Sequence, residues 1–101
     1  MTNAGFETGS SSPWTRTGGS TVISTPVHSG SHSLQITPSA SSTGECDQSV
    51  TLSPNTAYTL TAWVQGPYAY IGVTGGSGAV TVYVHGWYGQ SNVVADDFTL
   101  G

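Results

Sequence analysis

The chain contains 101 residues, a length that suits one folded domain built around one hydrophobic core. Charged residues make up 6% of it, and the net charge of −4 arises from five acidic residues against Arg16, with no lysine. Nucleic acid and anionic membrane surfaces are therefore excluded as expected partners, because the chain has almost no positive charge with which to neutralise phosphates.

The composition also favours a folded domain over a disordered segment. Apolar residues form 36% of the chain and occur in alternating runs, which disordered sequences lack. No apolar run is long enough to span a bilayer, and no basic start followed by an apolar stretch marks a signal peptide, so we expect a mature domain without its targeting signal. The lone Cys46 is expected to be a buried free thiol.

Eight short strands are predicted from alternating runs bounded by glycine, proline, asparagine and serine turns. In chain order they cover 14–16, 20–25, 33–37, 46–52, 57–65, 68–74, 79–85 and 93–100. Essentially no helix is expected, because every apolar stretch is interrupted by glycine or proline or alternates as a strand does. This pattern predicts an all-β fold: a β-sandwich of jelly-roll type with about eight short antiparallel strands, in one domain over residues 1–101.

The N-terminal third offers two aromatic core anchors and a pair of histidines. Phe6 is expected in the core, and Trp14 is expected to pack in the core or at its rim rather than contact a ligand. His28 and His32 stand four residues apart, a spacing that could hold a metal ion on a helix. The glycine between them and the strand that follows argue against a helix, so we interpret both as surface-loop histidines.

Strand parity assigns core and outer faces to the middle of the chain. Leu34 and Ile36 share the core face of their strand. In the clearest run, 57–65, Trp63 and Gln65 point outward. The core face of that run is predicted to comprise Tyr58, Leu60, Ala62 and Val64.

The strand at 79–85 and the loop after it combine an apolar face with a series of aromatic rings. Val80, Val82 and Val84 fall on one face at period two. The opposite face and the glycine-bounded loop that follows carry Tyr83, His85, Trp87 and Tyr88. A fully solvated face would instead be rich in small polar and charged residues, so these rings indicate a binding surface.

The outward residues of three neighbouring strands are predicted to form one surface suited to a neutral, polyhydroxylated ligand. Aromatic rings stack on the apolar faces of sugars, and amide, hydroxyl and imidazole groups bond to sugar hydroxyls. Each stacked ring contributes about 1 to 2 kcal/mol, so several are needed. The alternative is that half of the aromatics pack under loops or form a second core layer. The predicted ligand-contacting residues are Trp63, Gln65, Tyr68, Tyr70, Tyr83, His85, Trp87 and Tyr88.

The acidic residues at the two ends of the chain form a second candidate site. Glu7 and the Asp96–Asp97 pair would lie close together if the terminal segments pair, and carboxylates with turn carbonyls supply the oxygen ligands that Ca²⁺ prefers. Parity within 93–100 places Phe98 in the core, Asp96 inward and Asp97 outward. An inward Asp96 needs a cation or a donor. Solvated or hydrogen-bonded acids are an equal alternative.

Several motifs, taken in order, resemble the bacterial carbohydrate-binding modules of the family 4, 9, 16 and 22 type. The runs WVQGPYAYIGV and VYVHGWYGQ look like those of modules attached to secreted actinobacterial chitinases and other polysaccharide hydrolases. The resemblance covers nearly the whole chain. It rests on Asn3-x-Gly5-Phe6-Glu7, Trp14 after a serine loop, Ser29-Gly30-x-x-x-Leu34, Tyr58-Thr59-Leu60-x-x-Trp63-Val64 and Asp96-Asp97-Phe98-x-Leu100.

The resemblance implies a galactose-binding-like jelly roll that binds polysaccharide without chemistry of its own and is stabilised by structural Ca²⁺. The implied partners are a polysaccharide and a catalytic glycoside hydrolase domain in a secreted parent protein, with the module itself a monomer. The implied calcium ligands are the Gly5 carbonyl, the Glu7 carboxylate, a carbonyl of the 29–31 turn, taken as Ser31, and Asp96.

Two departures from the related modules stand out. Relatives carry a cysteine where Arg16 stands, able to pair with the equivalent of Cys46, so the resemblance implies a lost disulfide. Relatives also carry a longer segment between Gly75 and Val80, which is here the four-residue turn 75–78. We therefore expect a shortened domain, trimmed or engineered.

The resulting prediction is a non-catalytic module that binds a β-linked polysaccharide by aromatic stacking, with chitin first and xylan, cellulose or β-glucan next. One alternative is a structural or engineered β-sandwich without retained sugar binding. A glycoside hydrolase is a weaker alternative, because hydrolysis needs two carboxylates across a groove, whereas the acids here cluster at the chain ends or at 45–47, away from the aromatic residues.

Overall fold

The computed structural model describes residues 1–53, 56–75 and 78–101, which form eight strands and no helix. The described residues hold no helix long and apolar enough to traverse a membrane. The strands are β1 (Thr15–Arg16), β2 (Gly19–Ile23), β3 (Ser33–Thr37), β4 (Cys46–Thr51), β5 (Leu60–Gln65), β6 (Tyr70–Gly75), β7 (Ala79–His85) and β8 (Val93–Leu100).

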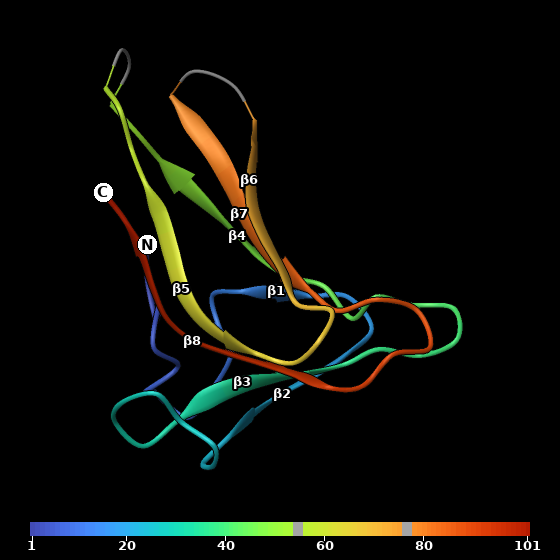
Figure 1. The fold of residues 1–101 in the computed structure, drawn as a ribbon. Helices are drawn as coiled ribbons and strands as arrows, with labels where there is room; N and C mark the ends of the chain where they lie inside the picture. The colour runs from blue at the N-terminus through green and yellow to red at the C-terminus, as the bar shows by residue number, and fades with distance from the viewer. Residues whose placement is uncertain (54–55, 76–77) are drawn as a thin grey trace.

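The strands form two four-stranded sheets in which every pairing is antiparallel (Figure 1). Sheet A has the order β1-β4-β7-β6, and sheet B has the order β2-β3-β8-β5. The predicted all-β sandwich of eight strands is therefore confirmed. Consecutive strands often change sheet, and β5 and β6 end up as edge strands of different sheets.

The core lies between the two sheets and is built from the apolar face of each strand. Phe6, Trp14 and Phe98 form an aromatic cluster, with ring centroids 5.0 to 6.2 Å apart. The predicted core positions of Phe6 and Trp14 are confirmed, since they are 0% and 4% exposed. The remaining buried apolar residues are Leu34, Ile36, Cys46, Val82, Val84, Val93 and Ala95.

Cys46 is fully buried in this core, as the sequence predicted. Burial, followed by the nearby Asp47 carboxylate, raises the pKa of its thiol to about 12. Because the thiolate is the reactive form of cysteine, Cys46 is an inert core residue.

Two predicted core residues of the β5 region are not buried in the core. Val64 is 44% exposed, and Tyr58 is half-buried outside the strand, where its hydroxyl accepts a hydrogen bond from the Ser53 N–H at 3.0 Å. The cause is the position of β5 at the edge of sheet B, where the described chain places no further strand. Val73 on β6, the matching edge of sheet A, is 40% exposed for the same reason.

The predicted parity of β8 is wrong at Asp96 because the strand contains a bulge. Thr61 pairs with Thr99 and Trp63 with Asp96, so β8 has one residue more than β5 across this interval. Asp97 adopts a left-handed backbone with φ 50°, which is how a bulge accommodates an extra residue. Asp96 therefore shares the outer face of sheet B with Trp63, while Phe98 still points into the core.

Candidate functional site

An aromatic strip covers part of the outer face of sheet A. Val82 and Val84 of β7 are fully buried, so Tyr83 and His85 between them point to the opposite, outer face. Tyr70 of β6 pairs with His85 and therefore shares that face. The strip consists of Tyr70, Tyr83, His85, Trp87 and Tyr88.

The five rings of the aromatic strip are in continuous contact. His85 stacks between two tyrosines, with its ring centroid 5.1 Å from that of Tyr70 and 5.7 Å from that of Tyr83. Trp87 continues the series at 5.7 Å from Tyr70, and Tyr88 lies edge-on to Trp87 at 5.2 Å. Tyr70, Trp87 and Tyr88 are each more than 40% exposed, so the strip offers ring surface to solvent.

Backbone features hold two of these rings in place. Gly72 lies opposite Tyr83, and a Cβ at Gly72 would collide with the Tyr83 phenol, so this ring lies flat across the glycine. Residue 72 must remain small for Tyr83 to rest on the sheet surface. The His85 Nδ1 lies 2.5 Å from the Gly86 carbonyl, which fixes that nitrogen as the donor and leaves Nε2 as the acceptor of a neutral ring.

Two carboxylates border the aromatic strip on the β4 side. Asp47 pairs with Tyr83 across β4 and β7 and so projects on the same face. Partial burial and the neighbouring Asp47 raise the pKa of Glu45. The prediction that these two acids lie away from the aromatic residues is wrong. Their distance along the chain from the aromatic residues does not reveal how β4 pairs with β7.

Three residues of the predicted ligand surface lie outside the aromatic strip. Trp63 and Gln65 belong to β5 in sheet B, whereas Tyr70 and Tyr83 belong to sheet A. The prediction that Trp63, Tyr70 and Tyr83 form one surface is therefore wrong. Parity shows on which face of its sheet a side chain lies, but it does not show to which sheet the strand belongs. Tyr68, 43% exposed, lies in the turn between the two sheets and shows no ring contact with the strip.

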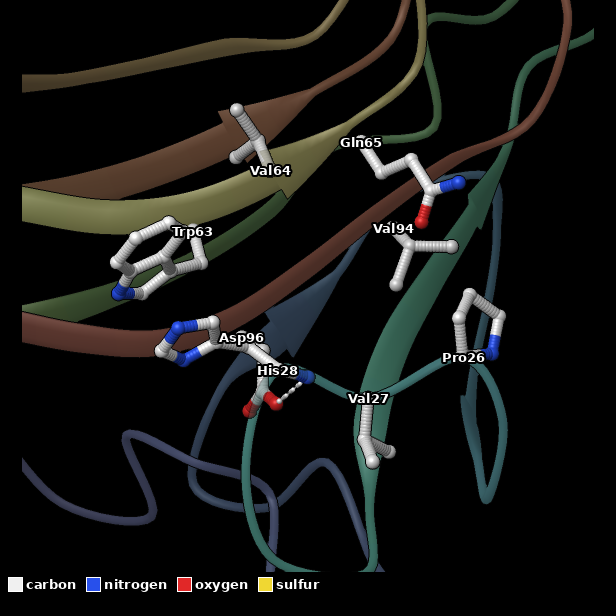
Figure 2. A pocket seen from close by; sticks show the side chains of 8 residues that line it. All are labelled: Pro26, Val27, His28, Trp63, Val64, Gln65, Val94 and Asp96. Atoms are coloured by element: carbon white, nitrogen blue, oxygen red, sulfur yellow. Dashed lines mark hydrogen bonds between the residues drawn. The ribbon is translucent and has the colours of Figure 1, made fainter.

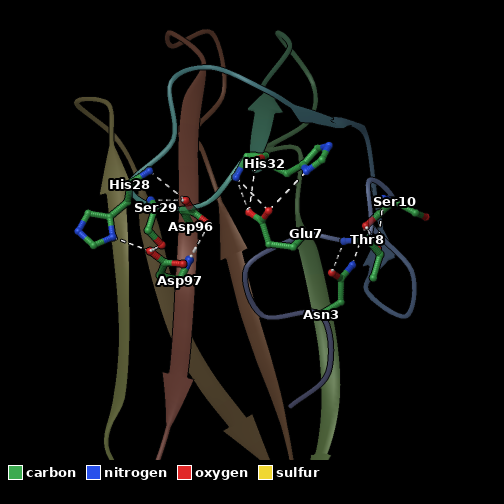
Figure 3. Close-up of polar contacts among 10 residues, drawn as sticks. Asn3, Glu7, Thr8, Ser10, His28, Ser29, His32, Asp96 and Asp97 are labelled. Atoms are coloured by element: carbon green, nitrogen blue, oxygen red, sulfur yellow. Dashed lines mark hydrogen bonds and ion pairs between the residues drawn. The ribbon is translucent and has the colours of Figure 1, made fainter.

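The predicted acidic site is a cluster of carboxylates held by the turn at 28–32 (Figure 3). The Glu7 carboxylate accepts the Ser31 N–H at 2.9 Å and the His32 N–H at 3.0 Å. Gly30 leaves room for it, since a Cβ there would come within 2.5 Å of Glu7 Oε2. The expected closeness of the two chain ends is confirmed, and hydrogen bonding through this turn supplies the connection.

Asp96 and Asp97 bind the first half of the same turn. Asp96 Oδ2 accepts the N–H groups of His28 at 3.0 Å and Ser29 at 3.4 Å, and Asp96 Oδ1 accepts the Asp97 N–H at 2.9 Å. These donors stabilise a carboxylate that is only 2% exposed. Asp97 Oδ2 accepts the Ser29 hydroxyl at 2.6 Å and lies 2.5 Å from His28 Nδ1.

The carboxylate cluster consists of Glu7, Asp96 and Asp97, and the two aspartates approach Gly5. The position of a Cβ on Gly5 lies 3.4 Å from Asp97 Oδ1 and 3.9 Å from Asp96 Oδ1. In the described ranges, no three His, Cys, Asp or Glu side chains converge closely enough to hold a metal ion. A cation here would therefore need backbone carbonyls to complete its shell. His28, predicted as a surface-loop residue, lies at one edge of the cluster.

Acid should loosen this turn. The Ser31 and then the His32 N–H hold the pKa of Glu7 below its ordinary value, and the Ser29 hydroxyl followed by His28 does the same for Asp97. A carboxyl group whose pKa is lower in the folded than in the unfolded state stabilises the fold at pH values above its unfolded-state pKa. This stabilisation is lost as the pH falls through the folded-state pKa. Urea unfolding from pH 7 to pH 3 should show this loss, and Glu7→Gln with Asp97→Asn should flatten it. Equal slopes in both proteins would contradict the assignment.

Comparison with known families shows the family of the chain. Residues 1–98 match the CBM_4_9 carbohydrate-binding domain, which covers nearly the whole chain. The chain belongs to this family. It is a non-catalytic carbohydrate-binding module, so the glycoside hydrolase alternative is wrong, and the predicted family resemblance is confirmed.

The module is similar to part of a chitinase. It is 39% identical to exochitinase 1 of Streptomyces olivaceoviridis over 97% of this chain and 21% of the enzyme, so it spans about a fifth of that relative. The alignment extends over 125 positions, more than the 101 residues of this chain, so the relative carries residues that this module lacks.

A solved structure supports the fold of the module. The structure of TmCBM61 in complex with β-1,4-galactotriose superposes with a TM-score of 0.77, covering 100% of this chain and 96% of that one at 23% identity. The β-sandwich architecture is therefore shared with a known carbohydrate-binding module.

Proposed function

We propose that the module binds a β-linked polysaccharide along the aromatic strip on sheet A, with chitin as the first candidate and xylan, cellulose or β-glucan next. The observation that carries the proposal is the continuous series of five exposed or half-exposed rings in a chain of a carbohydrate-binding family. The similarity to an exochitinase supports chitin over the other polysaccharides.

The strip supplies both kinds of contact that a sugar needs. Tyr70 and Trp87 offer ring faces to the apolar C–H face of a pyranose, and their half-exposed state means that stacking removes apolar surface from water. The His85 Nε2 is an acceptor for a sugar hydroxyl, because Nδ1 is engaged with the Gly86 carbonyl. The rigid β6–β7 ladder preorganises these groups, which lowers the entropic cost of binding.

Replacing Trp87 by alanine should weaken binding to chitin about five- to thirtyfold. This is the effect of losing one stacked ring, about 1 to 2 kcal/mol. Affinity electrophoresis and pull-down on insoluble chitin, xylan and cellulose would measure it, and Trp87→Phe should recover part of the affinity.

Val73→Ala is a matched control for the Trp87 variant. Val73 is exposed to a similar extent, 40% against 43%, but it pairs with the buried Val82 and so points away from the strip. Its removal should leave affinity unchanged. Equal binding by the Trp87→Ala protein and the parent on every polysaccharide would refute the proposed surface, and no binding by the parent would favour a structural β-sandwich without sugar affinity.

We further propose that the module tethers a catalytic glycoside hydrolase domain to its substrate in a secreted parent protein and acts as a monomer. The exochitinase relative, of which the module matches about a fifth, supports the tethering role. The longer alignment supports a shortened domain. The expected place of the shortening, 75–78, includes residues 76–77, which lie outside the described residues.

We also propose that Ca²⁺ binds beside Gly5. The Asp96 and Asp97 carboxylates approach Gly5, with the Glu7 side chain beside it, while Arg16 is bonded elsewhere, to the Ser20 carbonyl at 2.9 Å. Carbonyls of Gly5 and the 29–31 turn, including Ser31, would complete an oxygen shell of the kind that Ca²⁺ prefers.

Calcium titration tests this proposal. Adding CaCl₂ to EDTA-treated protein should release or absorb heat in calorimetry and raise the thermal midpoint, because a ligand of the native state stabilises it by mass action. Glu7→Gln should weaken the response, and MgCl₂ serves as the control for ionic strength. Unchanged midpoints in CaCl₂ and EDTA would show that the N–H groups of the turn satisfy the carboxylates by themselves.

A further inference from the structure

A hollow of about 180 Å³ lies on the outer face of sheet B (Figure 2), whereas the aromatic strip lies on sheet A. Two directly opposed pairs, Trp63 with Asp96 and Gln65 with Val94, form its floor on β5 and β8. The segment from Pro26 to His28 forms its wall. Trp63 and His28 stand together at one end of the hollow, and Pro26 stands at the other.

The Trp63 ring is held in a fixed orientation. It stacks on the His28 ring with centroids 3.8 Å apart and an interplanar angle of 12°. His28 is itself anchored, since its Nδ1 lies 2.5 Å from Asp97 Oδ2 and its N–H donates to Asp96. Trp63 nevertheless remains 60% exposed, the largest exposed fraction among the large apolar residues described. The indole therefore packs on His28 and still offers apolar surface at the hollow.

The rim of the hollow carries hydrogen-bonding groups that are free in the part of the chain that the structure describes. The Gln65 side-chain amide has no protein partner there, whereas the Trp63 indole N–H points away from Gln65 and Val94 (Figure 2). The buried Asp96 carboxylate accepts three N–H groups of the protein. The hollow therefore combines an apolar floor and wall, provided by Val94 and Val27, with neutral donors and acceptors at its edge.

We propose that this hollow is a second saccharide-binding site, which takes one pyranose ring of a neutral β-linked glycan. The ring would rest its C–H face against Trp63 and Val94, and its hydroxyls would bond to the Gln65 amide. The choice of ligand class rests on the proposed function, while the site itself is separate from the aromatic strip. An anionic sugar does not fit, because the carboxylate cluster lies directly behind His28.

The two sites face away from each other, because they occupy the outer faces of two sheets that enclose a common core. A module with one site on each face binds two polysaccharide chains at once. Attachment to an insoluble, multichain substrate is then strengthened by avidity without any gain in the affinity of either site.

The three tryptophans are built-in reporters for testing this proposal. Their indole N–H signals in ¹H–¹⁵N NMR spectra of the 101-residue chain report on the strip (Trp87), the hollow (Trp63) and the core (Trp14, whose indole donates to the Asn3 carbonyl at 3.1 Å). The probes are the soluble hexamers of β-1,4-linked N-acetylglucosamine, glucose and xylose. We expect at least one probe to shift the Trp63 signal saturably in both the parent protein and Trp87→Ala, with the Trp14 signal unmoved.

Variants of the hollow distinguish a binding site from an indirect effect. Gln65→Ala keeps the Trp63–His28 stack and should weaken the Trp63 titration about three- to tenfold, the effect of one lost hydrogen bond. It should leave the Trp87 titration unchanged. Trp63→Ala, checked for a native circular dichroism spectrum, should reduce the number of bound hexamers per protein measured by calorimetry from two to one.

Each outcome separates the two proposals. A Trp63 signal that stays fixed while the Trp87 signal saturates with every probe would overturn the second site and leave the aromatic strip intact. A Trp63 shift that disappears in Trp87→Ala would overturn it as well, because the shift would then be indirect. A Trp63 titration with an unmoved Trp87 would support the hollow and refute the proposed strip.

Discussion

Replacing Phe6 by alanine is expected to lower the free energy of unfolding by about 3 to 5 kcal/mol. Phe6 is fully buried, and its ring centroid lies 5.4 Å from that of Trp14 and 6.2 Å from that of Phe98. The substitution removes apolar contacts and leaves a cavity between rings that belong to different segments of the chain. For a domain of this size, whose total stability is about 5 to 15 kcal/mol, this loss is a large part of the whole.

Urea unfolding followed by tryptophan fluorescence would measure the effect, because Trp14 lies against the deleted ring. Phe6→Leu is the matched control, since it keeps most of the volume and the same left-handed backbone at residue 6, where φ is 59°. It should cost clearly less than Phe6→Ala. Losses of equal size in the two variants would show that ring packing at residue 6 is not what stabilises the core.

Arg16→Cys is expected to raise the free energy of unfolding by about 2 to 4 kcal/mol once the new cysteine is oxidised with Cys46. Arg16 and Cys46 are directly opposed Cα partners in the β1–β4 pair. Opposed residues of antiparallel strands have Cα atoms about 4.5 to 5.5 Å apart, which falls within the span of a disulfide. The bond would close the long connection between β1 and β4, which restricts the unfolded chain.

The oxidised variant should melt at a higher temperature than the parent, and dithiothreitol should abolish the gain. Arg16→Ser controls for the loss of the Arg16 guanidinium bond to the Ser20 carbonyl at 2.9 Å, and it should show no dependence on reductant. Mass spectrometry of the alkylated protein would establish that the bond has formed. An oxidised variant no more stable than its reduced form would mean that the buried setting of Cys46 strains the bridge.

The edge strands β5 and β6 leave one side of the sandwich open. β5 and β6 follow one another in the chain but lie at the edges of different sheets. Val64 and Val73, whose pairing partners Ala95 and Val82 are fully buried, are left 44% and 40% exposed at these edges. The exochitinase relative carries additional residues. In the described part of this module, the sandwich stays open between β5 and β6.

Local sequence pattern was sufficient for the elements and for most of the core. The alternation of valines in β7 predicted which residues would be buried and which would face outward, and the structure confirms it for Val82, Val84, Tyr83 and His85. The bounds of β3, β7 and β8 also agree with the sequence. These features follow from the period-two geometry of a strand, which each segment carries within itself.

Contacts between distant segments decided the sites. Trp63 and Tyr83 both point outward as predicted, but they are divided between two sheets, because pairing with β8 or β7 depends on partners elsewhere in the chain. The bulge at Asp97 likewise turned Asp96 to the outer face, where the His28 turn buries it. Parity determines on which face of its own strand a residue lies. Which strands become neighbours is decided by the free energy of the whole chain. The strip and the hollow could therefore be located only in the three-dimensional structure.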